Sequence, residues 1–131
     1  MQPTIEVLDR ELSVCKLSTA DEHLAELPFY FLSRTDKEVS LVCDTDRVPG
    51  GAVDRVDGWS AFRISGTLDF SLVGILSGIT TALADAGIGL FAVSTYDTDY
   101  VLVKRDDLER AIEALSSEGY GITSSAHLSG A

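Results

Sequence analysis

The chain has 131 residues, of which 45% are hydrophobic and 24% are charged, and its formal net charge at pH 7 is −11. This composition predicts one or two small folded domains and argues against a disordered chain. The 21 acidic residues outnumber the 10 basic ones, and the basic residues do not cluster. Binding to nucleic acid or to an anionic membrane surface is therefore not expected.

The sequence also indicates where in the cell the protein is expected and whether it binds a metal or a cofactor. No apolar run approaches the roughly 18 residues of a membrane span, and the N-terminus lacks the basic and apolar parts of a signal peptide. Cys15 and Cys43 are too few for a disulfide framework, so we expect two core thiols in a cytoplasmic protein. His23 and His127 lie far apart, and no phosphate-binding glycine motif is present. We therefore predict neither a metal nor a cofactor.

The first half of the chain has the pattern of short strands separated by turns. Its predicted elements, in order, are strands at 5–8 and 12–17, a helical turn at 18–27, and a hairpin with strands at 29–34 and 39–43. Residues 44–58 contain Pro49 and three glycines and are linker-like. The sequence therefore predicts a β-rich unit over residues 1–58.

The second half has a more regular pattern. Its predicted elements, in order, are a strand at 59–65, a helix at 71–86 ended by Gly87, strands at 88–93 and 100–103, a helix between Asp106 and Gly119, and a weak strand at 120–123. The strand at 88–93 is nearly all apolar and is expected to be buried on both faces. The order βαββαβ is that of a ferredoxin-like domain, with two helices on one face of a four-stranded antiparallel sheet. We predict an α+β protein whose ferredoxin-like domain at 59–131 follows a reduced copy of the same plan at 1–58.

The turn from Ser94 to Tyr100 is dense in hydroxyls and carboxylates beside strands that are expected to be buried. Such a turn can be simply a solvated hairpin loop closed by side-chain hydrogen bonds. Binding sites, however, concentrate on loops held by rigid scaffolds, so we expect a polar ligand site here. The candidate residues in this turn are Ser94, Thr95, Tyr96, Asp97 and Asp99.

Thr67 and Asp69 precede the first helix, in a turn that the topology is expected to bring near Asp97 and Asp99. The free amides of Phe70 to Val73 can hold a carboxylate, whereas the two aspartates can hold an ammonium or a guanidinium. A positive and a negative subsite together predict a zwitterionic amino acid as the ligand. The simpler role of Asp69 is that of a helix N-cap.

Two other chemistries are less well supported. Asp97 and Asp99 have the spacing of the start of a calcium-binding loop, but Tyr100 follows directly and the required glycine is absent. Ser94 or Thr95 beside Asp97 could form a nucleophilic site only with a neighbouring base, and no histidine or lysine lies nearby in the sequence. We therefore predict no catalytic residues and no enzyme activity.

Several segments resemble the ACT domain family, in the variant that pairs an ACT domain with a second ACT-like unit in small bacterial proteins. The segments that carry the resemblance are 66–76, 82–88 and 91–103, and the stretch 31–43 resembles the first unit of those proteins. The turn that ends at Asp99 is similar to that of the eukaryotic arginine sensors and, more loosely, to that of aspartokinase regulatory domains.

The resemblance implies a regulatory protein that binds an amino acid where two ACT units meet. It places Asp99 against the cationic group of the ligand and brings the backbone at the start of the first helix close to it. The residues carried over by the resemblance are Val73, Gly74, Ile75, Thr95, Tyr96 and Asp99. An acidic residue that the arginine sensors use early in this helix is replaced here by Leu72, which leaves the identity of the ligand open.

The expected partners are a small-molecule amino acid, a second copy of the chain and a partner enzyme. Ferredoxin-like sheets often leave an edge strand open, and pairing of such edges is one route to a homodimer. The alternative function is a ligand-independent interaction module that regulates a partner enzyme.

Overall fold

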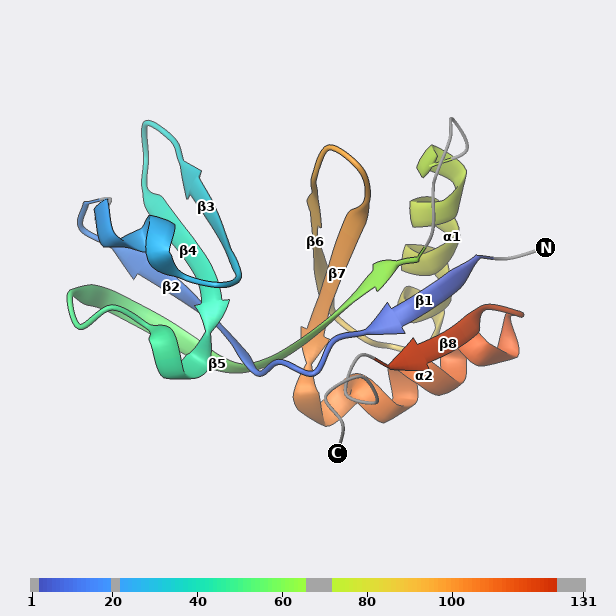
Figure 1. Ribbon diagram of the computed structural model, residues 1–131. Coiled ribbons are helices and arrows are strands. Elements are labelled where there is room, and N and C mark those ends of the chain that lie inside the picture. The colour runs from blue at the N-terminus through green and yellow to red at the C-terminus, as the bar shows by residue number, and fades with distance from the viewer. Residues whose placement is uncertain (1–2, 20–21, 66–71, 125–131) are drawn as a thin grey trace. The chain divides into compact units, whose positions relative to one another are not determined.

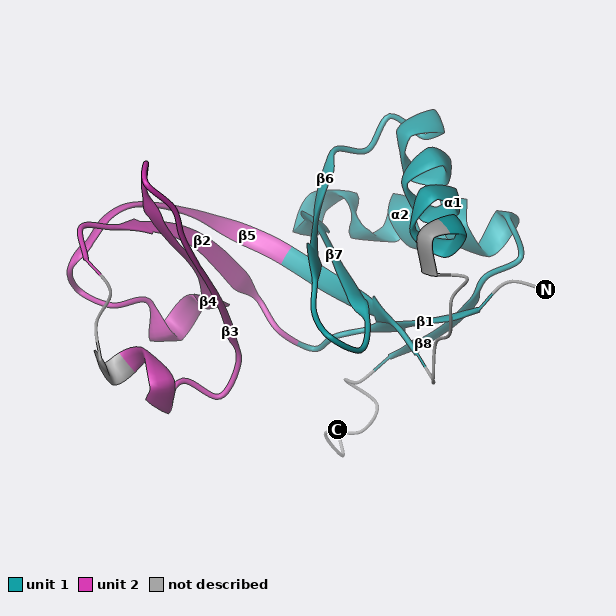
Figure 2. Cartoon of the chain, turned by 90° about the horizontal axis from the view of Figure 1, so that it is seen from above, with its two compact units in different colours: residues 1–9, 60–131 teal, residues 10–59 magenta. Residues whose placement is uncertain are grey.

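The chain forms two compact units in the computed structural model, which describes residues 3–19, 22–65 and 72–124 (Figures 1 and 2). Unit 1 comprises Met1–Asp9 and Ser60–Ala131, and unit 2 comprises Arg10–Trp59. The sequence predicts a boundary at residue 58. The chain passes from unit 2 to unit 1 between Trp59 and Ser60, and its first nine residues belong to unit 1.

In its described residues, unit 1 combines a β-sheet with two α-helices. Its elements in chain order are β1 (Thr4–Val7), the last part of β5 (Ala52–Ile64), α1 (Leu72–Asp85), β6 (Leu90–Ser94), β7 (Asp99–Lys104), the 3-10 helix η3 (Arg105–Asp107), α2 (Leu108–Ser117) and β8 (Gly121–Ser124). The strand order is β6-β7-β5-β1-β8. Without β1, this is the order of a ferredoxin-like sheet, which confirms the predicted α+β class.

The sheet of unit 1 differs from the predicted four-stranded antiparallel sheet because β1 lies within it. Ile5 pairs with Ile64 in antiparallel β5 and with Ile122 in parallel β8. Ile5 and Val7 are buried, at 0% and 8% exposure. Their alternation predicts the strand, but a period of two carries no information about which distant strand becomes the partner.

The core of unit 1 lies between one face of the sheet and the two helices. Ile79 and Leu83 of α1 and Ala111 and Leu115 of α2 are fully or almost fully buried. The sheet residues in the same cluster alternate along their strands and therefore share one face; they are Ile5, Val7, Phe62, Ile64, Val101 and Val103. Gly87 has a φ of +75° just after α1, which confirms the predicted end of this helix.

Strand β6 lies at the edge of the sheet and pairs, among the described strands, only with β7. Ala92 and Ser94 are exposed, and none of its residues is fully buried. The prediction that this apolar strand is buried on both faces is therefore wrong. An apolar run predicts burial on average, but the position of a strand within the sheet decides how much of it is covered.

Unit 2 has the same strand order with 3-10 helices in place of α-helices. Its elements are β2 (Leu12–Leu17), η1 (Glu22–Glu26), β3 (Tyr30–Arg34), β4 (Val39–Asp44), η2 (Thr45–Arg47) and the first part of β5. The order β3-β4-β2-β5 joins antiparallel neighbours throughout.

Residues 44–58 are not a linker throughout, because β5 begins at Ala52. Pro49, Gly50 and Gly51 form the turn before it, and the strand then pairs with β2 from Ala52 to Trp59. Three of the four residues at 54–57 are charged, so the hydropathy pattern does not indicate a strand here. Within the described part of unit 2, β5 pairs only with β2 and so forms an edge of the sheet. Charged side chains are common on edge strands because they remain in contact with water.

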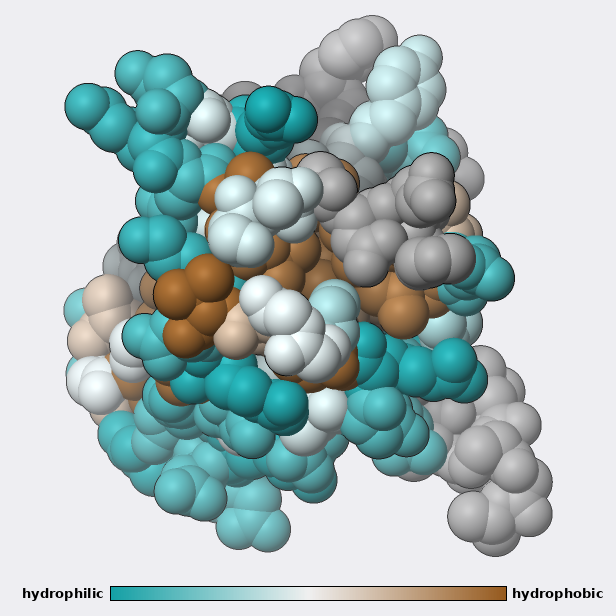
Figure 3. Space-filling model, turned by 90° about the vertical axis from the view of Figure 1, so that its left-hand side faces the viewer, coloured by the Kyte–Doolittle hydropathy of each residue, from teal (hydrophilic) through white to brown (hydrophobic). Residues whose placement is uncertain are grey.

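Unit 2 has a small core on one face of its sheet. Cys15, Leu41 and Cys43 are almost completely buried there, and both cysteines are free thiols, as the sequence predicts. Leu24 of η1 packs into the same cluster. Leu32 and Val53 remain 41% and 63% exposed. A space-filling view shows hydrophobic residues gathered near the middle of one face of the chain, with hydrophilic residues around them (Figure 3).

Candidate functional site

The turn between β6 and β7 is closed by its own polar groups. The Thr95 amide donates to the Thr98 carbonyl at 2.8 Å, and the Thr95 hydroxyl donates to the same oxygen at 3.0 Å. The Thr98 hydroxyl donates to the carbonyl of Ile64 at 3.1 Å. The turn is therefore tied to the end of β5, from which the chain continues toward α1.

The two aspartates of this turn have different environments. Asp99 is only 6% exposed and pairs with Ser94 across the hairpin, where the Ser94 hydroxyl donates a hydrogen bond to its carboxylate. Asp97 is exposed, and Tyr96 is completely exposed. The structure thus holds one carboxylate at a fixed position and leaves the other in solvent.

The start of α1 contributes backbone and open space. Gly74 is exposed, and a Cβ placed there would meet, among the described residues beyond its own turn of helix, no atom within 4 Å. Ile75 is partly buried against the core, so its side chain serves packing. Val73 lies in the first turn of α1. The predicted site residues Thr67 and Asp69 lie outside the described residues.

An ion pair between β1 and β5 is not evident from the sequence. Arg63 donates from Nε and Nη2 to the two carboxylate oxygens of Glu6, at 3.0 and 3.3 Å, and from Nη1 to the Tyr100 hydroxyl at 3.2 Å. These hydrogen bonds, that to Glu6 above all, raise the pKa of Arg63. This guanidinium is therefore already engaged. Its partners lie 57 and 37 residues away in the sequence, which is why sequence patterns could not find the cluster.

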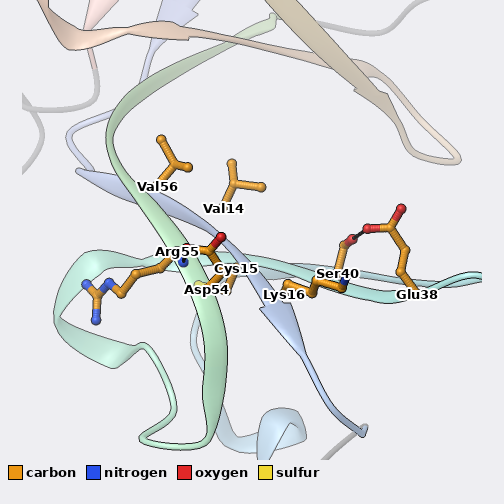
Figure 4. A pocket seen from close by; sticks show the side chains of 8 residues that line it. All are labelled: Val14, Cys15, Lys16, Glu38, Ser40, Asp54, Arg55 and Val56. Carbon is orange, nitrogen blue, oxygen red and sulfur yellow. Dashed lines mark hydrogen bonds between the residues drawn. The ribbon is translucent and has the colours of Figure 1, made fainter.

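A pocket of about 180 Å³ lies in unit 2 and was also not predicted (Figure 4). Side chains of β2, β4 and β5 line it, together with Glu38 just before β4. The sequence places these residues in separate strands, a turn and a linker. Only the pairing of three strands brings them together, so the sequence pattern does not indicate a pocket.

Two kinds of feature are absent from the described ranges. There, no three His, Cys, Asp or Glu side chains group closely enough to hold a metal ion. None of the helices in these ranges is long and apolar enough to cross a membrane.

Comparison with known proteins gives a family match that agrees with the resemblance in the sequence. The family model of the ACT domain matches residues 54–117. A crystal structure of protein Atu0741 from Agobacterium tumefaciens is 32% identical to this chain. That alignment has a TM-score of 0.85 and covers 95% of this chain and 94% of the other. Among curated proteins, no significant match is found.

More distant solved structures share the fold alone. Protein VC0802 from Vibrio cholerae, described as a possible transport protein, is 19% identical, with a TM-score of 0.68 over 87% of this chain and 88% of that one. The ligand-free regulatory subunit of aspartate kinase from Thermus thermophilus is 12% identical, with a TM-score of 0.61 over 89% of this chain and 98% of that one.

Proposed function

Because the chain belongs to the ACT domain family, we propose that it is a non-catalytic regulatory protein that binds a free amino acid. The proposed site lies in unit 1, at the β6–β7 turn and the start of α1. The observation that carries the proposal is the buried Asp99 carboxylate, bonded to Ser94 in a turn that is tied to the end of β5. A fixed, shielded carboxylate suits recognition of a cationic group, because few competing waters surround it.

The proposed roles follow from the chemistry of each group. Asp99 accepts hydrogen bonds from the ammonium or guanidinium of the ligand, and Ser94 orients it. The early amides of α1, near Val73, Gly74 and Ile75, take the carboxylate, since a helix N-terminus favours negative charge. Thr95, Tyr96 and Asp97 form the rim of the proposed site, and Thr67 and Asp69, which lie outside the described residues, are its remaining proposed members.

Calorimetric titration of the full chain with each of the twenty amino acids tests the proposal. At least one amino acid is expected to release or absorb heat at millimolar concentration or below. Asp99→Asn should weaken that binding about tenfold or more, because a charge-assisted hydrogen bond is lost. Asp97→Asn is the matched control and should have a smaller effect, because Asp97 is exposed. No heat with any amino acid would contradict the proposal and favour the ligand-independent interaction module.

The proposed assembly is a homodimer that acts on a partner enzyme. In unit 1, β6 offers an edge that pairs, within the described strands, with β7 alone, and its side chains are mostly apolar. Pairing of two such edges would extend the sheet. Light scattering during size-exclusion chromatography should give twice the chain mass. Ala92→Lys, at an exposed edge position, should shift the protein toward the monomer. A monomeric wild-type chain would contradict this assembly.

A further inference from the structure

Strand pairing in unit 2 builds two adjacent rows of side chains on one face of its sheet. In the first row, Val14 of β2 lies between Val42 of β4 and Val56 of β5. In the second row, Lys16 lies between Ser40 and Asp54. Side chains alternate along each strand, so both rows lie on the face opposite the cysteine cluster. An apolar row therefore runs directly beside a charged one.

The 180 Å³ pocket lies where these two rows meet (Figure 4). Its ligand-accessible chemistry comes from six side chains, which are Val14, Lys16, Glu38, Ser40, Asp54 and Val56. Cys15 and Arg55 also line the pocket, but Cys15 belongs to the buried cluster and Arg55 is bonded to Asp57 at 2.9 Å. The volume is below the roughly 300–1,000 Å³ of pockets for drug-sized ligands, so the pocket suits a small metabolite.

The charged groups of this pocket are not paired with one another. Within the described part of the chain, the Lys16 ammonium makes no hydrogen bond or ion pair, although Asp54 stands opposite it in the sheet. The Asp54 carboxylate accepts from the Arg55 amide at 2.8 Å, and the Glu38 carboxylate accepts from the Ser40 hydroxyl at 2.9 Å. Each carboxylate keeps further acceptor capacity. The pocket thus offers an available cation and two acceptors of positive charge.

We propose that this pocket is a binding site for a small aliphatic zwitterion, that is, an α-amino acid with a short branched side chain. Its carboxylate pairs with Lys16, its ammonium pairs with Asp54 or Glu38, and its side chain packs on Val14 and Val56. A plain anion would meet two carboxylates, and a plain cation would meet the lysine, so only a molecule with both charges satisfies the lining. This site is separate from the β6–β7 turn and does not rest on the function proposed there.

Three small probes of matched shape test the proposal on the full, uniformly ¹⁵N-labelled chain. They are L-valine, isovalerate, which lacks the ammonium, and isobutylamine, which lacks the carboxylate. L-valine at millimolar concentration should shift the amide signals of residues 14–16, 38–40 and 54–56 in heteronuclear NMR spectra. The other two probes should bind at least tenfold more weakly, because each leaves charged groups unpaired. Equal binding of either one, or no shifts in these segments with L-valine, would overturn the proposal.

Variants separate this site from the one in unit 1. Lys16→Met should weaken the L-valine shifts in unit 2 about tenfold or more. Lys37→Met is the matched control, because Lys37 is exposed and lies outside the pocket lining, and it should leave them unchanged. Asp99→Asn should also leave them unchanged. Shifts confined to Ser94–Tyr100 would support the unit 1 site and overturn this one, as would shifts in unit 2 that persist unchanged in Lys16→Met.

Discussion

Ser94 and Asp99 form the cross-strand pair next to the β6–β7 turn, and the Ser94 hydroxyl donates a hydrogen bond to the buried Asp99 carboxylate. A buried carboxylate costs free energy unless hydrogen bonds compensate for the water that it has lost. This one bond therefore stabilises both the fold and the position of the acid on which the proposed function depends.

Removal of that hydroxyl should destabilise unit 1. We expect Ser94→Ala to lower the free energy of unfolding by about 1–3 kcal/mol, because the Asp99 carboxylate then stays buried with a partner missing. Urea denaturation at neutral pH measures the change. Ser33→Ala, at an exposed position of β3, is the matched control and should stay within about 0.5 kcal/mol of wild type. Equal losses in the two variants would contradict the stabilising role of Ser94.

The Glu6–Arg63 pair should contribute measurably to stability. Two parallel hydrogen bonds fix its geometry, and the side chains of Arg63 and Glu6 are 36% and 17% exposed. In a double-mutant cycle of Glu6→Gln and Arg63→Met, we expect a coupling free energy of about 1 kcal/mol. Urea denaturation of the wild type, both single variants and the double variant gives this value.

The control for that cycle is the Asp107–Arg110 pair, which joins the last residue of η3 to the first turn of α2. It has one hydrogen bond of 2.9 Å, and its arginine side chain is 53% exposed. Its coupling free energy should not exceed about 0.5 kcal/mol, as for other surface pairs at this spacing on a helix. Equal coupling free energies in the two cycles would show that the two parallel hydrogen bonds between Arg63 and Glu6 do not strengthen this ion pair.

The sequence predicts much of the fold because the informative patterns are local. The apolar stripe of α1, the buried run of β7 and the glycine at position 87 each depend on neighbours within a few residues. The partner of β1 and the strand at 52–58 depend on pairing between distant segments, which hydropathy does not encode. The stretch 54–57, in which three of four residues are charged, therefore has the pattern of a linker, although residues 54–56 pair with β2.

The same reasoning applies to the candidate sites. The polar turn after β6 is evident from composition, but the difference between Asp97 and Asp99 arises from the hairpin register, which pairs Asp99 with Ser94. No sequence pattern indicates the pocket beside Lys16. Its lining comes from segments around residues 14, 40 and 54, and only the sheet order β4-β2-β5 brings them into contact.

The two cysteines of unit 2 should make stability depend on pH in alkaline solution. Burial raises the pKa of Cys15, and it raises that of Cys43 to about 12, with further increases from Cys15 and Asp44. An unfolded thiol has a pKa of about 8.5. The unfolded chain therefore loses these protons first, so the contribution is fully present below about pH 8.5 and is lost as the pH rises toward 12.

The pH dependence of Cys43→Ala measures this contribution. Between about pH 9 and 11, its free energy of unfolding should fall less steeply than that of wild type, by up to about 1.4 kcal/mol per pH unit. Val39→Ala removes apolar volume from the same cluster without removing a titratable group. It should lower stability at every pH and keep the wild-type slope. Parallel profiles for Cys43→Ala and wild type would contradict the raised pKa of Cys43.

Gly74 and Gly78 stand about one turn apart in α1 and should respond in opposite ways to alanine. A Cβ at Gly78 would lie 2.7 Å from the Tyr120 hydroxyl, whereas a Cβ at Gly74 would meet no atom within 4 Å in the described part of the chain outside its own helix. Gly74→Ala should raise the free energy of unfolding by up to about 1 kcal/mol, through helix propensity alone. Gly78→Ala has the same gain but also overpacks against a buried tyrosine, so we expect a net loss of about 1 kcal/mol.

Removing the tyrosine hydroxyl tests whether this clash is the cause. In the Gly78→Ala/Tyr120→Phe double variant, the new methyl group occupies space that the oxygen has left. The double variant should therefore be more stable than the sum of the two single changes predicts, by about 1 kcal/mol or more in urea denaturation. The Gly74→Ala/Tyr120→Phe combination should be additive, because position 74 does not approach Tyr120. Additive behaviour of both pairs would mean that Gly78 is required for some reason other than contact with Tyr120.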